Sequence, residues 1–197
     1  MTQTQASSAQ AVLILGGRDH QAWAAAQLLN LLGLAMDICP QPTASNYEET
    51  AFWEHPRFTA IHRGLLRTLG SDWDDLRPLP AATWSHPNIT PFKKALHLQI
   101  AASFDGKKLW GLKDPSLSRL VPLWELLLKP AGISPVILYI ITDPLVEAEL
   151  LARERGWSKG RACLLWLRTL LDGEKNTRHL RRWFVTTQAE PVSMRLA

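Results

Sequence analysis

The sequence contains few of the residues on which metal clusters, disulfide frameworks and membrane spans depend. Its two cysteines, Cys39 and Cys163, are too few and too far apart in sequence for a metal cluster or a disulfide framework. No apolar run approaches the ~20 residues that a membrane span needs. The polar start MTQTQASSAQ lacks the charged and then apolar pattern of a secretion signal. These absences predict a cytoplasmic protein without a membrane span.

Several catalytic motifs are also missing. There is no Gly-x-Ser-x-Gly sequence and no Cys/His arrangement of the kind that hydrolases use. The histidines show no ligand spacing with Asp, Glu or Cys, so we assign no metal. The glycine pair Gly16 and Gly17 is not followed by the Gly-Lys and Ser/Thr residues of a nucleotide-binding P-loop. Hydrolase and metal-dependent chemistry are therefore not indicated.

Composition indicates one globular domain with a mildly basic balance. Apolar residues make up 46% of the chain and charged residues 20%, and the net charge is +4. This charge favours an anionic partner, but four of the cations lie in residues 175–182, as in a solvated helix end. The aromatic interleaving of a nucleic-acid surface is absent there, so nucleic acid is not expected. The nine tryptophans indicate core packing, with a ring-stacking face for a sugar as the alternative.

Short apolar runs alternate with helical patterns along the chain. Residues 11–15 and 135–141 are apolar on both faces, as in strands buried inside a parallel sheet. Further strands are expected at 109–112 and 183–186, and helical spacing covers 22–32, 56–69, 92–104, 116–129, the stretch after 144, and 158–180. The pattern predicts an α/β fold with a single-domain parallel β-sheet flanked by helices over residues 11–187. Residues 1–10 form a polar N-terminal segment and 188–197 a C-terminal tail.

Parallel sheets of this class bind ligands outside the carboxyl ends of their strands. That rule selects three places in the sequence: residues 16–21, the pair Lys113 and Asp114, and the pair Thr142 and Asp143. We expect these segments to meet at one edge of the sheet.

Several phrases resemble the sulfotransferase family, particularly its bacterial members, and they occur in the family's order. After the glycine turn come Leu-Leu-Asn-Leu-Leu-Gly at 28–33, Phe-Trp-Glu at 52–54, and Leu-Gly-Ser-Asp-Trp-Asp-Asp at 69–75. Trp-Gly-Leu-Lys-Asp-Pro follows at 110–115, and Thr-Asp-Pro-Leu at 142–145. The likeness covers most of residues 12–187.

The resemblance implies a P-loop-kinase-like scaffold and sulfuryl transfer from 3′-phosphoadenosine 5′-phosphosulfate (PAPS) to a hydroxyl of a saccharide or small molecule. It implies that Glu54 is the base, with His20 and Lys113 as further catalytic candidates. The residues that it places at the donor are Gly16, Gly17, Arg18, Asp19, His20, Gln21, Ala22, Thr142 and Asp143. The residues that it places at the acceptor are Phe52, Trp53, Trp73 and Asp114.

The sequence departs from the family at both phosphate clamps. The family's donor loop reads Gly-x-x-Arg-Ser-Gly-Thr-Ser, and alignment from Gly16 puts Asp19 at the place of its arginine. The second clamp, an arginine and a serine, is replaced by Thr142 and Leu150. The helix between them carries Glu147 and Glu149, which would repel a phosphate that they faced. Little chain follows the last strand, so the scaffold is expected to be C-terminally short.

Two functions therefore remain open. The first is a PAPS-dependent sulfotransferase. The second is a catalytically inactive relative that binds a ligand or a protein partner through Trp-rich loops at Trp53, Trp73 and Trp84. Glu54 is read equally well as an acid at a helix N-terminus, and Lys113 and Asp114 as an ion pair. A shared scaffold does not decide between the two functions.

Overall fold

The computed structural model of the protein describes residues 9–18, 20–36 and 55–187. In these residues four parallel strands form a sheet in the order β2-β1-β3-β4. The strands are β1 (Gln10–Leu15), β2 (Leu109–Lys113), β3 (Val136–Thr142) and β4 (Arg182–Thr187). The α-helices are α1 (His20–Leu31), α2 (Pro56–Thr68), α3 (Thr90–Phe104), α4 (Leu117–Leu128), α5 (Pro144–Arg155) and α6 (Lys159–Thr177). The predicted α/β class, with a parallel sheet flanked by helices, is confirmed.

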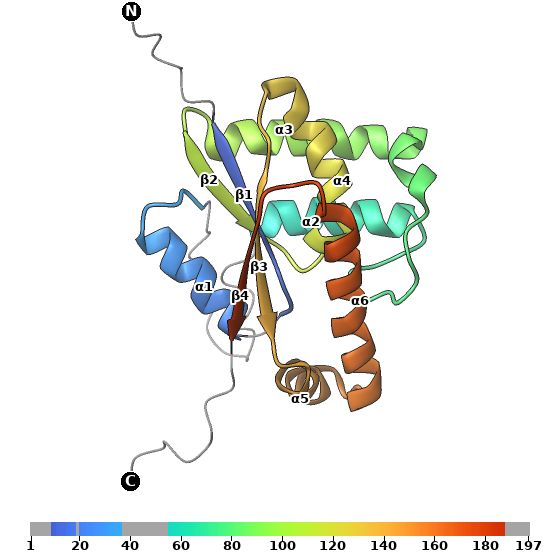
Figure 1. Cartoon of the computed structure of the whole chain (residues 1–197). Coiled ribbons are helices and arrows are strands. Elements are labelled where there is room, and N and C mark those ends of the chain that lie inside the picture. Colours follow the sequence, from blue (N-terminus) through green and yellow to red (C-terminus); the bar gives the residue numbers. More distant parts are fainter. Residues whose placement is uncertain (1–8, 19, 37–54, 188–197) are drawn as a thin grey trace, which may run out of the picture.

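The two central strands, β1 and β3, are the runs that the sequence shows as apolar on both faces. They pair directly, with Leu13 beside Ile137 and Leu15 beside Tyr139. Side chains alternate across a strand, so Leu13 and Leu15 enter one core layer while Ile14 enters the other. Both layers are apolar because helices cover both faces of these strands (Figure 1).

The described helices lie on both faces of the sheet. On one face helix α1 packs on the strands, with Ala22 and Ala26 in one cluster with Ile14 and Ile140. Its alanines favour helix and allow a close approach to the sheet. Helices α2, α3, α4 and α6 lie on the opposite side (Figure 1). The larger core therefore lies on that side.

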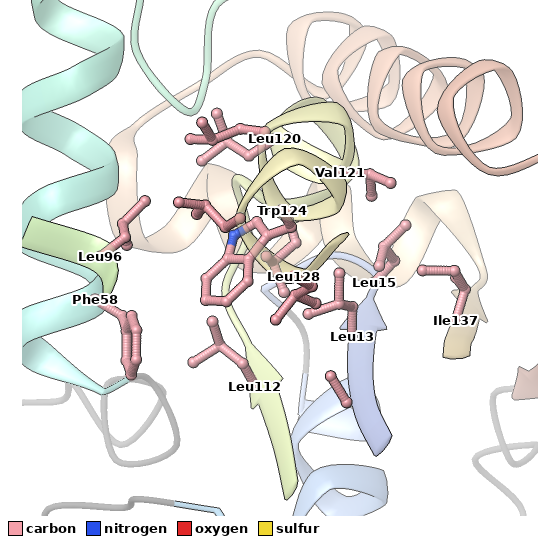
Figure 2. Close-up of a cluster of buried hydrophobic side chains, with 14 of the residues drawn as sticks. Leu13, Leu15, Phe58, Leu96, Leu112, Leu120, Val121, Trp124, Leu128 and Ile137 are labelled. Carbon is pink, nitrogen blue, oxygen red and sulfur yellow. The ribbon is translucent and has the colours of Figure 1, made fainter. Parts of the chain in front are cut away.

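The larger core is centred on Trp124 of α4. Trp124 is fully buried, with its ring 5.8 Å from that of Phe58 and 6.3 Å from that of Trp110. Figure 2 shows this helix between the sheet, represented by Leu13 and Leu112, and the helices on the far side. Burying a large apolar side chain contributes roughly 1.5–3 kcal/mol. Helix α4 thus joins the sheet to the outer helices.

One backbone carbonyl of α4 loses its helical partner because of a proline. Pro122 lies inside the helix and has no N–H to donate to the carbonyl of Ser118 one turn earlier. The side chain of Asn176 in α6 fills this gap, because its Nδ2 donates to that carbonyl at 2.9 Å. The carbonyl that Pro122 leaves without a helical donor therefore forms a specific hydrogen bond between α4 and α6.

We predict that Asn176→Ala destabilises the fold by roughly 1–3 kcal/mol, because it leaves a buried carbonyl without a donor. In a Pro122→Ala background the same substitution should cost less, since an alanine at this position restores the helical N–H. Urea unfolding of the four proteins of this double-mutant cycle measures the coupling. Equal costs of Asn176→Ala in both backgrounds would show that the amide does not compensate for the proline.

A short extended segment after α1 continues the sheet beyond β2. The Ala35 N–H donates to the Leu109 carbonyl at 3.3 Å, and the Gly111 N–H donates to the Ala35 carbonyl at 2.9 Å. This segment covers the outer edge of β2. None of the helices in the described part of the chain combines the length and apolar composition that crossing a membrane requires.

Candidate functional site

The carboxyl ends of β1, β2 and β3 bring the three predicted segments to one edge of the sheet. β1 leads into Gly16 and Gly17, β2 ends at Lys113, and β3 ends at Thr142. Helices α1 and α5 begin at this same edge, so their N-terminal amides lie there as well. The chain leaves β1 toward one face and β2 toward the other, and such divergence creates a crevice in α/β folds.

The glycine turn after β1 is closed by a carboxylate from α5. Glu147 is only 3% exposed, and its Oε1 accepts a hydrogen bond from the Arg18 N–H at 3.4 Å. A Cβ atom at Gly17 would overlap the same carboxylate, so an alanine there would require the Glu147 side chain to move. Glu149, further along α5, is 64% exposed and lies 3.5 Å from the Lys159 ammonium. Of the two glutamates, Glu147 alone faces the turn.

The side chain of Arg18 is buried against a tryptophan. It is 6% exposed, and its guanidinium carbon lies 5.1 Å from the centre of the Trp73 ring. Its Nε and Nη1 atoms have no hydrogen-bond partner among the described residues. Trp73 in turn stacks on Trp157 at 6.1 Å, and Arg161 lies over Trp157 at 3.9 Å. A row of planar side chains thus runs from the turn to the start of α6.

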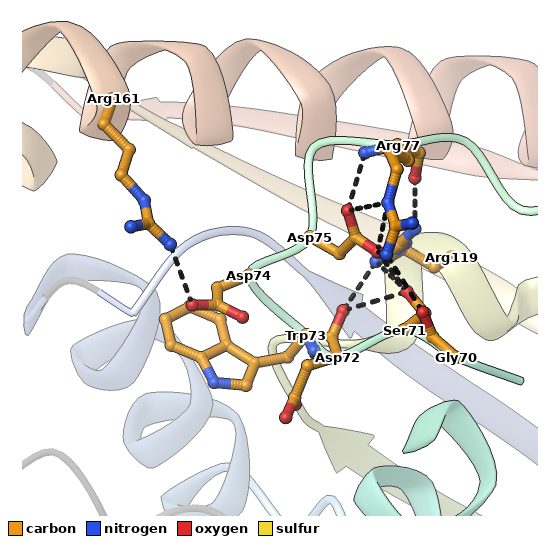
Figure 3. A network of polar contacts seen from close by, with 9 residues as sticks. All are labelled: Gly70, Ser71, Asp72, Trp73, Asp74, Asp75, Arg77, Arg119 and Arg161. Carbon is orange, nitrogen blue, oxygen red and sulfur yellow. Dashed lines mark hydrogen bonds and ion pairs between the residues drawn. The ribbon is translucent and has the colours of Figure 1, made fainter. Parts of the chain in front are cut away.

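The loop that carries Trp73 is held in place by Arg119 of α4. Arg119 Nη1 donates to the Asp72 carbonyl at 2.6 Å and to the Ser71 hydroxyl at 3.2 Å. Its Nη2 donates to the Arg77 carbonyl at 2.6 Å, as Figure 3 shows. Burial lowers the pKa of Arg119, although the nearby carboxylate of Asp172 favours the charged form. A long irregular segment is thereby fixed as a wall beside the site.

A hollow of about 520 Å³ lies along this loop, lined by residues 70–72, 74–77 and 161. Its three carboxylates each have an arginine partner. The pairs are Asp72 with Arg67, Asp74 with Arg161, and Asp75 with Arg77. The hydrogen bond from Arg77 holds the pKa of Asp75 well below its usual range. The hollow therefore has no excess negative charge that would select a cation.

The two residues at the end of β2 turn to opposite faces. Lys113 is in register with Ile14 and is buried on the α1 side. Asp114 turns toward α2, where its carboxylate accepts from the Thr59 hydroxyl at 2.9 Å and the Ser116 N–H at 2.8 Å. His62 Nδ1 lies 3.3 Å from the same carboxylate. Asp114 is thus engaged by residues of α2 and of its own turn, not by Lys113.

The protonation state of the buried Asp114 carboxylate follows from the groups that donate hydrogen bonds to it. Trp124 Nε1–H donates to His62 Nε2 at 3.2 Å, so the proton of the neutral ring is on Nδ1, facing Asp114. Burial by itself raises the pKa of Asp114. The His62 ring and the hydrogen bonds from Ser116 and Thr59 outweigh that effect and hold the pKa well below its usual range. Asp114 is therefore a charged structural anchor.

At the end of β3 the Thr142 carbonyl and the Asp143 carboxylate accept structural hydrogen bonds, whereas the Thr142 hydroxyl has no partner among the described residues. The Thr142 carbonyl accepts from Trp166 Nε1 at 3.0 Å, and Thr142 is buried. Asp143 is the N-cap of α5, since its Oδ1 accepts from the Leu145 N–H at 2.8 Å. Leu150, at the position of the family's clamping serine, is buried. No cationic side chain takes the place of the second clamp at these positions.

Several predicted site residues lie outside the described residues, namely Asp19, Phe52, Trp53 and Glu54. His20 begins α1, and its side chain is also outside the description. Gln21 and Ala22 follow in the first turn, where Ala22 packs on the sheet. His55 caps α2 by accepting the Arg57 N–H at 3.1 Å. Trp84 and Trp73 are half-buried and pack against the larger core.

Sequence reasoning missed the roles of His62, Thr59 and Arg119. These residues are isolated polar positions on helical apolar faces, and no local pattern connects them with their partners. The position of Glu147 near the turn could be predicted in part from the sequence. Glu147 lies four residues after the helix-capping Asp143, and therefore about one helical turn from the sheet edge.

These features define an α/β protein with a parallel sheet and a polar site at the carboxyl ends of its strands. No model of a known protein family matches the chain, and no curated protein matches it significantly. No group of three or more His, Cys, Asp or Glu side chains is placed as metal ligands in residues 9–18, 20–36 and 55–187. The likeness to sulfotransferases therefore remains a prediction from motifs.

We predict that Asp114→Asn destabilises the protein by roughly 3 kcal/mol at neutral pH, because a charged acceptor of several hydrogen bonds is lost. The folded pKa of Asp114 is depressed, so its contribution is complete above the unfolded value of about 3.9. It is lost as pH falls further toward the folded pKa. Urea unfolding between pH 3 and 7 should therefore show a shallower acid slope for Asp114→Asn than for wild type. The exposed Asp105→Asn is the control, and equal slopes for wild type and Asp114→Asn would contradict the assignment.

We predict that Gly17→Ala destabilises the protein by about 1–3 kcal/mol, because the new methyl group overlaps the Glu147 carboxylate. Glu147→Ala should remove most of that cost by opening the space. A double-mutant cycle followed by urea unfolding measures the coupling between the two positions. Additive effects would show that the carboxylate does not lie against the turn.

Proposed function

We propose that this chain is a sulfotransferase-like protein that does not catalyse PAPS-dependent transfer and acts instead as a ligand- or protein-binding module. One observation carries the proposal: the glycine turn after β1 already holds a carboxylate of the chain itself. Glu147 accepts a hydrogen bond from the Arg18 amide and lies in contact with Gly17. A phosphosulfate bound at this turn would need the same donor and the same space.

The chemistry of the turn supports this assignment. A phosphate oxygen 4 Å from a carboxylate meets a repulsion of about 4 kcal/mol at a surface-like dielectric. That repulsion corresponds to roughly a thousandfold weaker binding. Thr142 and Leu150 offer no cation for the 3′-phosphate either, because neither side chain carries a charge. Both anionic ends of PAPS are thus poorly accommodated.

The scaffold part of the proposal is supported by how the motifs are distributed over the fold. The glycine turn follows a central strand, and the Trp-Gly-Leu-Lys-Asp-Pro phrase forms β2 and the turn after it. The Leu-Gly-Ser-Asp-Trp-Asp-Asp phrase forms the loop that Arg119 anchors beside that turn. A P-loop-kinase-like sulfotransferase scaffold brings its motifs to the same edge of the sheet, which favours this scaffold.

A second candidate function, active PAPS-dependent sulfuryl transfer, is favoured by one observation. Arg18 carries a buried guanidinium whose Nε and Nη1 lack hydrogen-bond partners in the described chain, and an anion would satisfy them. In this case the acceptor hydroxyl of a saccharide or small molecule would lose its proton to Glu54 as its oxygen bonds to sulfur. The bond from sulfur to the bridging phosphate oxygen would break, and adenosine 3′,5′-bisphosphate would leave.

Thermal unfolding with adenosine 3′,5′-bisphosphate distinguishes the two candidates. We expect no rise in Tm for wild type at ~1 mM nucleotide, whereas a ligand at 100 times its Kd would stabilise the fold by roughly 2.7 kcal/mol. Glu147→Ala removes the charge and opens the space beside Gly17, so it should gain measurable nucleotide binding. Glu149→Ala, on the exposed side of the same helix, is the matched control and should behave as wild type.

Nucleotide binding by the wild-type protein would contradict this expectation. Saturable stabilisation of wild type, together with sulfuryl transfer from PAPS to a simple hydroxyl acceptor, would overturn the non-catalytic proposal. Loss of that transfer in Glu54→Gln would then assign the base.

A further inference from the structure

Helix α6 has an unusual distribution of side chains. Its inward positions are Ala162, Leu165, Asp172, Gly173 and Thr177, which are mostly small or polar. Three leucines lie outside instead: Leu164 is 54% exposed, Leu167 42% and Leu171 52%. We call these three residues the leucine stripe. A helix that hides an aspartate and exposes leucines does not follow the usual amphipathic pattern.

The inward residues are set by specific partners, which leaves the larger side chains outside. Gly173 lies against the Tyr139 ring, where a Cβ atom would collide. Asp172 forms ion pairs with Arg168 and with Arg119, whose Nε lies 3.6 Å away. The inner face is thus already filled, and the leucine stripe has no role in the core.

The spacing of the leucine stripe suits another helix. Intervals of three and four residues place Leu164, Leu167 and Leu171 along one line of α6, about 10 Å long. These intervals are those of the a and d positions of a heptad, whose side chains pack between the side chains of a facing helix. A partner strand would present side chains at a period of two and would not match this line.

A row of cations accompanies the leucine stripe. Arg161, Arg168 and Lys175 recur every seven residues on one side of it. Arg161 lies 3.4 Å from Asp74, and Arg168 is paired with Asp172. Lys175 is exposed and forms no ion pair with any described residue. In heptad terms this row takes the e positions, which select partners by charge.

We propose that the leucine stripe docks an amphipathic helix of another protein, whose apolar side is flanked by carboxylates. Charge argues against a second copy of this chain. Antiparallel packing of two α6 helices would place the cation row opposite itself, and parallel packing would place it opposite Cys163 and Leu170. An acidic amphipathic helix would cover the leucines and offer a carboxylate to Lys175, the cation of the row that forms no ion pair with a described residue. This surface is independent of what the glycine turn binds.

Fluorescence anisotropy with two labelled synthetic peptides tests the proposal. Both peptides carry three heptads with leucine at a and d, and they differ only in glutamate or lysine at the flanking positions. We expect wild type to bind the glutamate peptide at least tenfold more tightly than the lysine peptide. Leu167→Gln combined with Leu171→Gln should weaken that binding at least tenfold. Leu98→Gln, at a leucine of α3 that is 64% exposed, is the control and should leave it unchanged.

A charge reversal provides a second, less disruptive test. Lys175→Glu changes an exposed residue and should weaken glutamate-peptide binding while strengthening lysine-peptide binding. Circular dichroism confirms that each variant is folded.

Four results would overturn the proposal. The first is equal affinity for both peptides, and the second is no binding of the glutamate peptide at ~100 µM. The third is self-association of wild type that the double leucine variant abolishes, which would assign the surface to a second copy. The fourth is sedimentation with phosphatidylserine vesicles that the same variant abolishes without any peptide binding, which would assign it to a lipid surface.

Discussion

Helix α4 is buried on nearly every side, and each polar group that it carries into the interior needs a partner from another element. Arg119 donates hydrogen bonds to the backbone of the 70–77 loop, and Trp124 donates one to His62 of α2. The Ser118 carbonyl accepts one from Asn176 of α6. Because burying a polar group without a partner costs several kcal/mol, these contacts fix three elements around one helix. The contacts of Arg119 place the 70–77 loop beside the candidate site.

The same demand for partners explains the contacts of the carboxylates at the sheet edge. Asp114 is engaged by Thr59, His62 and Ser116, and Asp143 caps α5. At the glycine turn the carboxylate of Glu147 accepts a hydrogen bond from the Arg18 amide. In phosphate-binding loops at helix N-termini, amides of this kind bind the anion. The edge keeps the form of a ligand site. Asp114, Asp143 and the Arg18 amide are bonded within the chain, whereas Arg18 Nε and Nη1 and Thr142 Oγ1 have no hydrogen-bond partner among the described residues.

The secondary structure was predictable from local pattern to a large degree. The apolar runs at 11–15 and 135–141 became β1 and β3, and the helix expected from residue 56 begins there as α2, because periodicity and proline act locally. The expected helix at 158–180 ended earlier, at Thr177. The pairing of Ala35 with β2 was not predictable, because its partner Trp110 is distant in sequence and no local signal marks the register.

By itself the sequence determined that the chain alternates strands and helices, that the strands are buried, and that the glycine turn, Lys113–Asp114 and Thr142–Asp143 end strands. Those properties depend on short-range periodicity and on the conformational preferences of single residues. Only the tertiary structure decided which of the two α5 glutamates faces the turn and which residues surround the Asp114 carboxylate. It also decided that α6 turns its leucines outward. Each of these outcomes depends on contacts between residues distant in sequence, and the steric and hydrogen-bonding demands of the partner, not local propensity, select the side that faces inward.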